Sequence, residues 1–200
     1  MIISPHEQGT EEWFAARLGK PSASNFSKLI TATGKPSASA GGYINQLIAE
    51  RLTGQSEPFY QNEHMARGTE LEPEAREAYE FITGEEIIEH GFILDDSGEF
   101  GCSPDGLSSL GLTGLEIKCP AANTMVKYLR DPQSLAKAYY QQIQGCMLVT
   151  AAVAWDAFAY HPEMPHVIVT VLRNDEYIKQ LAEQINLAVN VILTEVERLT

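Results

Sequence analysis

Cysteine and long hydrophobic runs are both scarce in this sequence of 200 residues. The three cysteines form no Cys-x-x-Cys pair, which argues against a disulfide framework, a structural zinc site and a four-cysteine iron–sulfur cluster. We expect all three to be free thiols, buried or partly buried. No apolar run of about eighteen residues occurs, so no membrane span is predicted, and the first residues lack the pattern of a secretory signal. A cytoplasmic protein is therefore expected.

Basic residues are also few, with 14 Lys and Arg against 27 Asp and Glu and a net charge of -13. This balance argues against tight binding to nucleic acid, because lysine and arginine are the residues that bind phosphate groups. The charge is nevertheless a sum over the whole chain, and a nuclease centre itself needs carboxylates to hold its cations. The composition therefore does not exclude a nuclease.

The hydrophobic pattern predicts one domain that mixes helices and strands. With 44% hydrophobic residues the chain is long enough for one substantial core, and we predict a single domain over residues 1–200. Helical spacing predicts helices at 10–18, from 22 or 24 to 30, 43–52, 65–83, 124–129, 136–149 and 175–199. Strand-type runs predict strands at 86–94, 100–103, 106–109, 112–119, 152–160 and 166–172, with a loop at 31–42. This order indicates an α/β or α+β fold with a mixed central sheet flanked by helices.

Three polar residues stand out in the middle of the chain. Asp105 lies in a Pro-Asp-Gly turn, and Glu116 and Lys118 follow on the predicted strand 112–119. Successive side chains of a strand point to opposite faces, so Glu116 and Lys118 share one face, while the apolar residues between and beside them face the core. If the strand that follows Asp105 is a neighbour of this one, the three polar groups converge.

Such a set fits the hydrolysis of a phosphodiester. Two carboxylates, with water and a phosphate oxygen, complete the oxygen shell of Mg²⁺ or Mn²⁺, and the backbone carbonyl of Ile117 is a further candidate ligand. The lysine at 118 would orient or deprotonate the attacking water, or stabilise the phosphate during the reaction. The alternative interpretation is an exposed turn acid beside an ordinary strand ion pair. The combination at this separation matches the Pro-Asp…(Asp/Glu)-x-Lys signature of nucleases, and we predict a metal-dependent nuclease.

Five ordered motifs make the interpretation more specific. The motifs are WFAARLGKPSAS at 13–24, GTELEPEAR at 68–76, CSPDG at 102–106, LEIKCP at 115–120 and YYQQIQ at 139–144. Together they resemble the lambda exonuclease/YqaJ-type alkaline exonucleases of phage recombination, from about residue 10 to beyond residue 175.

The resemblance implies a concrete activity and assembly. It implies a restriction-endonuclease-like core and a processive exonuclease that depends on Mg²⁺, with Mn²⁺ as a substitute and two ions per site. It implies digestion of the 5′ strand of double-stranded DNA, which leaves a 3′ overhang. It also implies a homotrimeric ring around the DNA, a bacterial or prophage setting and a single-strand annealing protein as partner. For so acidic a chain, a ring requires a positive inner channel within an acidic exterior, and binding that is sensitive to salt.

By motif position, the resemblance also implies additional residues at the catalytic centre. Glu72 is expected as a further acid of the metal site, although on an acidic helix it would otherwise be read as a solvated charge. Gln142 and Tyr139 are expected to line the site from their helix. A surface position is the alternative for the glutamine.

The same resemblance implies residues that hold the DNA end. Arg17 and Ser24 are expected to bind the 5′-terminal phosphate, for which a guanidinium is well suited. The alternative for Arg17 is an ion pair along its helix with Glu11 or Glu12. Met65 is expected as a nonpolar wedge at the terminal base pair, although a methionine more often fills a core.

Two other functions remain open at this point. One is a site- or structure-specific endonuclease on the same core, which would cut circular DNA. The other is a catalytically inactive DNA-binding or assembly protein, which would bind DNA without cleaving it. The intact set of Asp105, Glu116 and Lys118 argues against the second.

Overall fold

The computed structural model describes residues 1–56 and 63–200, the side chains of residues 63–65 excepted. Its centre is a five-stranded mixed sheet in which β6 and β7 are parallel and every other neighbouring pair is antiparallel. In spatial order this sheet consists of β2 (Ile87–Ile88), β5 (Gly106–Ser108), β6 (Thr113–Lys118), β7 (Ala154–Ala159) and β8 (Val167–Leu172). A smaller antiparallel sheet consists of β1 (Ile2–Ile3), β3 (Ile93–Leu94) and β4 (Gly101–Cys102).

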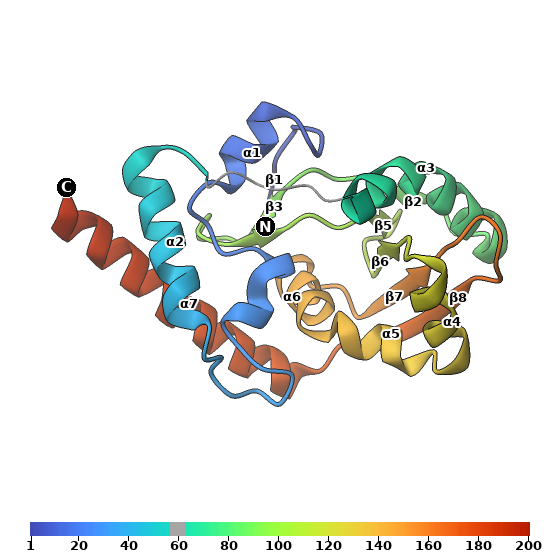
Figure 1. Ribbon diagram of the computed structural model, residues 1–200. Coiled ribbons are helices and arrows are strands. Elements are labelled where there is room, and N and C mark those ends of the chain that lie inside the picture. Colours follow the sequence, from blue (N-terminus) through green and yellow to red (C-terminus); the bar gives the residue numbers. More distant parts are fainter. Residues whose placement is uncertain (57–62) are drawn as a thin grey trace.

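Helices cover both faces of the five-stranded sheet, which confirms the predicted fold class (Figure 1). Helix α3 lies on one face of this sheet, and α4, α5 and α6 lie on the other. Helices α2 and α7 pack against each other at the side of the molecule away from the five-stranded sheet. The helices are α1 (Glu11–Arg17), the 3-10 helix η1 (Ala23–Lys28), α2 (Ala40–Thr53), α3 (Glu63–Thr83), α4 (Ala122–Arg130), α5 (Gln133–Ala138), α6 (Tyr140–Thr150) and α7 (Asp175–Leu199).

Local signals account for where several helices begin. The hydroxyl of Thr10 accepts a hydrogen bond from the backbone N–H of Trp13 and so caps α1. The side chain of Asn174 caps α7 in the same way, through the N–H of Tyr177. Helix α7 buries its predicted apolar stripe, which packs into the main core. The two caps are contacts within one helical turn, and the α7 stripe follows the apolar spacing of the predicted helix 175–199.

Two predicted elements were wrong because the chain changes direction inside them. The expected strand 86–94 is two short strands, β2 and β3, which belong to different sheets. Gly91 lies between them, and a Cβ there would be 2.0 Å from the carbonyl oxygen of His6. The expected helix 136–149 is divided into α5 and α6 at Tyr139, whose φ of -115° and ψ of 14° leave the helix. The expected helix ending at residue 30 is the 3-10 helix η1.

The core is divided by the sheet. The larger cluster surrounds Trp155 on the side of α6, and a smaller one joins Tyr79 of α3 to Phe158 of β7. Gly114 is required beside Trp155, because a Cβ there would lie 2.3 Å from the indole ring. All three cysteines are free, as predicted. None of the helices within the described ranges is long and apolar enough to span a membrane.

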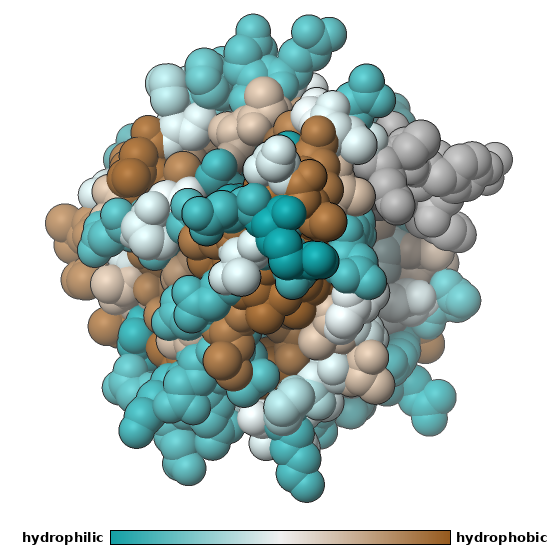
Figure 2. All heavy atoms as spheres, turned by 90° about the vertical axis from the view of Figure 1, so that its left-hand side faces the viewer, coloured by the Kyte–Doolittle hydropathy of each residue, from teal (hydrophilic) through white to brown (hydrophobic). Residues whose placement is uncertain are grey.

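The face formed by α2 and the end of α7 carries apolar groups at its surface. Figure 2 shows this side of the molecule, with hydrophobic residues gathered in patches between hydrophilic ones. The exposed apolar side chains of these two helices are Leu52, Leu187, Val191, Leu193 and Leu199.

Candidate active site

Asp105 lies where the chain passes from the small sheet into the large one. It follows β4 and directly precedes β5, whose Gly106 is paired with Leu115 of β6. The strands of Asp105 and Glu116 are thus neighbours, as the sequence analysis required. The carboxylate Oδ2 of Asp105 accepts a hydrogen bond from the backbone N–H of Ile117 at 2.6 Å. This bond fixes the turn acid at the edge of β6, between its two polar residues.

Glu116 and Lys118 share the face of β6 that α6 covers. Only 1% of the Glu116 side chain is exposed, and its Oε1 accepts hydrogen bonds from Lys118 Nζ and, at 2.6 Å, from Gln142 Nε2. The ammonium of Lys118 lies 5.0 Å from the centre of the Tyr139 ring. The break in the helix at Tyr139 therefore puts the aromatic ring and the glutamine beside the same ion pair. The structure brings these four predicted residues together.

The sixth predicted residue comes from the opposite face of the sheet. Glu72 is on α3, and its Oε1 accepts a hydrogen bond of 3.0 Å from Arg76. The same arginine donates to the backbone carbonyl of Asp105 at 3.2 Å and so connects the Glu72 carboxylate to the turn of Asp105. Glu72 therefore lies beside the Asp105 turn, paired with Arg76, and is not a freely solvated charge.

Burial changes the protonation of all three acids. It raises the pKa of Glu116 to about 7, although Lys118 opposes the shift. Burial and the charge of Asp105 raise the pKa of Glu72 to about 7, and burial also raises the pKa of Asp105. For Lys118, burial lowers the pKa, but the charges of Glu116 and Asp105 outweigh it and the net shift is upward. The site thus holds a protonated lysine among acids that resist ionisation without an additional cation.

The donor atoms fit a hard divalent cation. Glu116 Oε2 is buried and has no hydrogen-bond partner among the described atoms. The carbonyl of Lys118 accepts a hydrogen bond from the N–H of Tyr160, the residue after β7. Because carbonyls alternate along a strand, the carbonyl of Ile117 points to the other side of β6, where β5 has not yet begun. Within residues 1–56 and 63–200, no three His, Cys, Asp or Glu side chains lie close enough to form a ligand cage. Mg²⁺ needs no such cage, because it takes one or two carboxylates with water and substrate phosphate.

The raised pKa of Glu116 predicts a pH-dependent stability of the metal-free protein. An acid whose pKa rises from 4.5 to about 7 on folding stabilises the fold fully below 4.5, and this contribution is lost as the pH rises through 7. Glutamine resembles the protonated acid at all pH values. Melting temperatures of wild type and Glu116→Gln should therefore be similar near pH 5, and the variant should be the more stable by several degrees near pH 8.

The control for this comparison is Glu11→Gln, which changes an exposed acid of α1. Its melting temperature should follow that of wild type from about pH 5 to about pH 8. A difference between wild type and Glu116→Gln that stays constant over this range would contradict the assigned burial effect.

A second group of polar side chains lies next to this centre. The guanidinium of Arg17 lies over the ring of Trp13 at 4.1 Å and is 3.5 Å from the hydroxyl of Ser22, which is 3.3 Å from that of Ser24. The indole N–H of Trp13 donates to the hydroxyl of Ser103, two residues before Asp105, at 3.1 Å. The two residues expected to bind the 5′-phosphate are therefore close together, and Trp13 connects them to the turn.

Arg17 stays without an acid partner in the described part of the chain. It does not form the alternative ion pair within α1, and its pKa is lowered, mainly by burial. Sequence reasoning missed Ser22, Ser103 and Arg76, although all three lie inside the quoted motifs. The expected wedge, Met65, belongs to α3, but its side chain lies outside the described residues.

The fold and the site point to one class of protein. The mixed sheet brings two acids and a lysine together beside its central strand, the residue types with which a nuclease can hold a divalent cation and stabilise a phosphate. A family model for the YqaJ-like viral recombinase domain matches residues 12–153. The chain belongs to this family, which confirms both the resemblance and the prediction of an enzyme of the nuclease class.

Solved structures agree with this assignment. The alkaline exonuclease LHK-Exo from Laribacter hongkongensis is 36% identical, covers 95% of this chain and 96% of its own, and superposes with a TM-score of 0.84. The same enzyme in complex with dAMP matches equally well. A phage-related exonuclease from Haemophilus somnus 129PT shares the fold, with a TM-score of 0.75 and 16% identity over 90% of this chain and 96% of its own. No curated protein matches the sequence.

Proposed function

We propose that this protein is a Mg²⁺-dependent exodeoxyribonuclease that digests the 5′ strand of linear double-stranded DNA and leaves a 3′ overhang. The observation that carries the proposal is the convergence of Asp105, Glu116 and Lys118 at the end of β6, with one buried carboxylate oxygen of Glu116 left unpaired. The similarity to LHK-Exo supports the exonuclease class, and the dAMP complex of that relative supports a nucleotide product.

Each residue at the centre has a proposed task. Asp105, Glu116, the Ile117 carbonyl and Glu72 would hold Mg²⁺, or Mn²⁺ in its place, and we propose two ions. The metal would polarise the scissile phosphate and lower the pKa of a bound water. Lys118, which is positively charged, stabilises the negative charge that develops on the phosphate. Two further residues orient the ion pair between Glu116 and Lys118. Gln142 holds Glu116 through its amide, and Tyr139 places its ring beside the ammonium.

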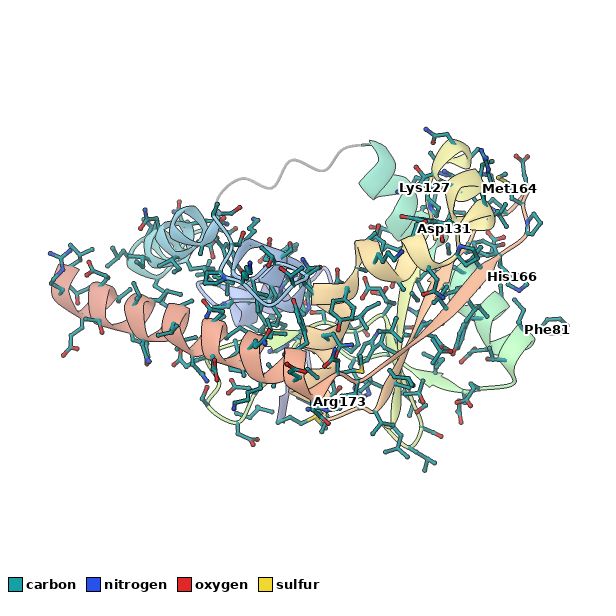
Figure 3. The ribbon with its side chains drawn as sticks, turned by 90° about the horizontal axis from the view of Figure 1, so that it is seen from below. Phe81, Lys127, Asp131, Met164, His166 and Arg173 are labelled. Atoms are coloured by element: carbon teal, nitrogen blue, oxygen red, sulfur yellow. The ribbon has the colours of Figure 1, made fainter. Side chains whose placement is uncertain are left out.

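The group around Arg17 is proposed to select the DNA end. A guanidinium with no acid partner among the described residues, next to the hydroxyl of Ser24, is suited to the 5′-terminal phosphate. The segment that follows the catalytic strand, residues 119–155, contains three basic residues and one acid. It is thus positively charged in a chain whose net charge is -13. Lys127 is one of the three basic residues, and Figure 3 shows it on α4, the helix that follows the catalytic strand. We propose that this region faces the DNA backbone.

The assembly remains a proposal of the same kind. We propose a homotrimeric ring with a positive channel, working with a single-strand annealing protein in a bacterial cytoplasm. Support comes from the motif resemblance and from the exposed apolar side chains of α2 and α7, which a subunit contact would cover.

The test is digestion of linear duplex DNA that carries a label at the 5′ end or at the 3′ end, with and without Mg²⁺. The 5′ label should be released first and only with the metal, and 5′-phosphorylated ends should be digested faster than 5′-hydroxyl ends. Because an exonuclease needs an end, a closed circle of the same sequence should stay intact.

The other outcomes are equally informative. Cutting of the closed circle would show an endonuclease on the same core, and early release of the 3′ label would reverse the proposed polarity. DNA binding without cleavage of any substrate at any Mg²⁺ or Mn²⁺ concentration would contradict the enzyme and favour a binding protein.

A further inference from the structure

Arg76 is the residue that connects the acids from the two faces of the sheet. Its side chain is 12% exposed and uses three nitrogen atoms. Nε donates to the backbone carbonyl of Asp105 at 3.2 Å, Nη2 to Glu72 Oε1 at 3.0 Å, and Nη1 is 2.7 Å from Glu89 Oε1. A guanidinium is planar, so these three partners fix its position and, through it, the distance between Asp105 and Glu72.

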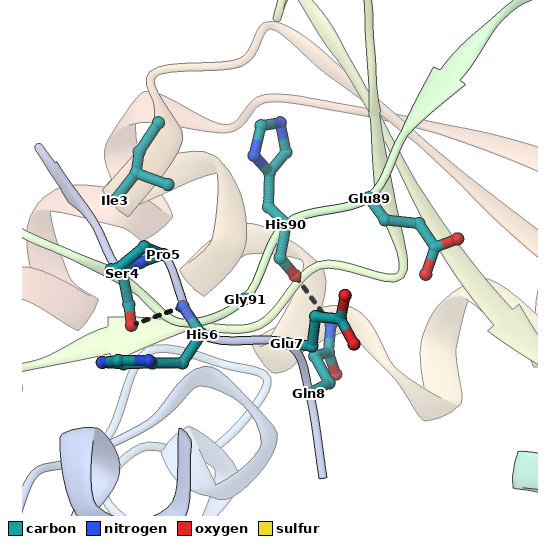
Figure 4. Close-up of a pocket in the computed structure, with 9 residues that line it drawn as sticks. All are labelled: Ile3, Ser4, Pro5, His6, Glu7, Gln8, Glu89, His90 and Gly91. Atoms are coloured by element: carbon teal, nitrogen blue, oxygen red, sulfur yellow. Dashed lines mark hydrogen bonds between the residues drawn. The ribbon is translucent and has the colours of Figure 1, made fainter. Parts of the chain in front are cut away.

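The turn that presents Asp105 is held from a second direction. The amide of Gln8 donates to the carbonyl of Pro104 at 2.9 Å and to that of His90 at 3.0 Å. Figure 4 shows this side chain and Glu89 in the wall of a pocket of about 260 Å³ between the N-terminal segment and residues 89–91. Both carbonyl groups of the turn thus accept a side-chain hydrogen bond, one from Gln8 and one from Arg76.

We propose that Arg76 is a positioning residue for metal binding, which sets the Asp105 turn against Glu72 so that their carboxylates face one cation. This inference rests on the proposed metal-dependent function. Glu89 holds the arginine from its far side and so takes part indirectly. A lysine at this position keeps the charge and the pairing with Glu72, but its single amine cannot reach three partners on three elements.

The decisive variant is therefore Arg76→Lys. Mg²⁺ and Mn²⁺ affinities are measured by calorimetry and by the rise in melting temperature on metal addition, and the Mg²⁺ concentration for half-maximal cleavage is measured alongside. We expect the metal affinity to fall by about tenfold or more, as for other hydrogen-bond partners of metal ligands. At saturating metal most of the kcat should return, because the ligands themselves are intact.

The matched control is Arg173→Lys. Arg173 also joins a backbone carbonyl, that of Met147, to a carboxylate, that of Asp175. It follows β8 and is bonded to Val153 at the start of β7, the opposite end from Lys118, and Figure 3 shows it apart from Lys127 and α4. This variant should lose some thermal stability and keep the wild-type metal affinity.

A second variant removes the carboxylate that pairs with Arg76 on the side away from Glu72. Glu89 is 68% exposed, so Glu89→Gln should fold normally and weaken metal binding less than Arg76→Lys does. The inference would be overturned if Arg76→Lys and Glu89→Gln both kept the wild-type metal affinity. It would also be overturned if Arg173→Lys lost as much metal affinity as Arg76→Lys. If wild type binds the metal but cleaves no DNA, the proposed function fails while the comparison of affinities still decides the role of Arg76.

Discussion

Replacing Lys118 by alanine is expected to lower kcat for duplex digestion by about a thousandfold, while DNA binding and the Mg²⁺-induced rise in melting temperature are kept. The ammonium lies at Oε1 of Glu116, beside the unpaired Oε2, so its charge is available to the phosphate that a bound metal would hold. The variant removes this charge from the transition state and leaves the oxygen ligands in place. Single-turnover cleavage with excess enzyme measures the chemical step directly.

The control for Lys118→Ala is Lys179→Ala, which removes an exposed lysine from α7, outside the region proposed to face the DNA, and should keep kcat within a factor of about two. Because the substitution at 118 also leaves Glu116 buried without its cation, the melting temperature is measured on the same samples. A folded Lys118→Ala protein that retains more than about a tenth of the wild-type kcat would refute the assigned role.

Replacing Asp105 by asparagine is expected to remove both cleavage and the response to metal. The amide oxygen still accepts the N–H of Ile117, so the turn keeps its geometry and only the negative charge is lost. Mg²⁺ at about ten times its Kd should raise the melting temperature of wild type by about 3–6 °C and leave Asp105→Asn unchanged. The kcat of the variant should fall by about a thousandfold, since the metal is the main source of charge stabilisation.

The matched control is Asp156→Asn, in the same sheet. Asp156 is paired in register with Leu115 of β6 and accepts a hydrogen bond of 2.7 Å from the hydroxyl of Tyr79, outside the proposed metal site. This variant should keep both the metal response and the cleavage rate, whatever its stability. A metal response in Asp105→Asn equal to that of wild type would show that the cation binds elsewhere.

The amino-acid sequence alone determined the features that depend on neighbouring residues. A strand alternates its side chains, so the spacing of two residues was enough to put Glu116 and Lys118 on one face. Thr10 marks the beginning of α1, because its hydroxyl bonds a backbone N–H only three residues ahead. The mixed sheet with its flanking helices followed from the order of the hydrophobic patterns.

Only the tertiary structure decided which of these elements meet. A hydrophobic pattern shows that a face is buried, but it does not show which element covers it. The convergence of Glu72 and Gln142 on β6 from opposite faces therefore depended on how α3 and α6 pack. The division of residues 86–94 between two sheets and the contact of Arg76 with Asp105, 29 residues away, were invisible for the same reason. The division of the strand and the arginine contact both depend on packing between residues far apart in the sequence. Such packing determines the geometry of the site, and no local spacing of residues predicts it.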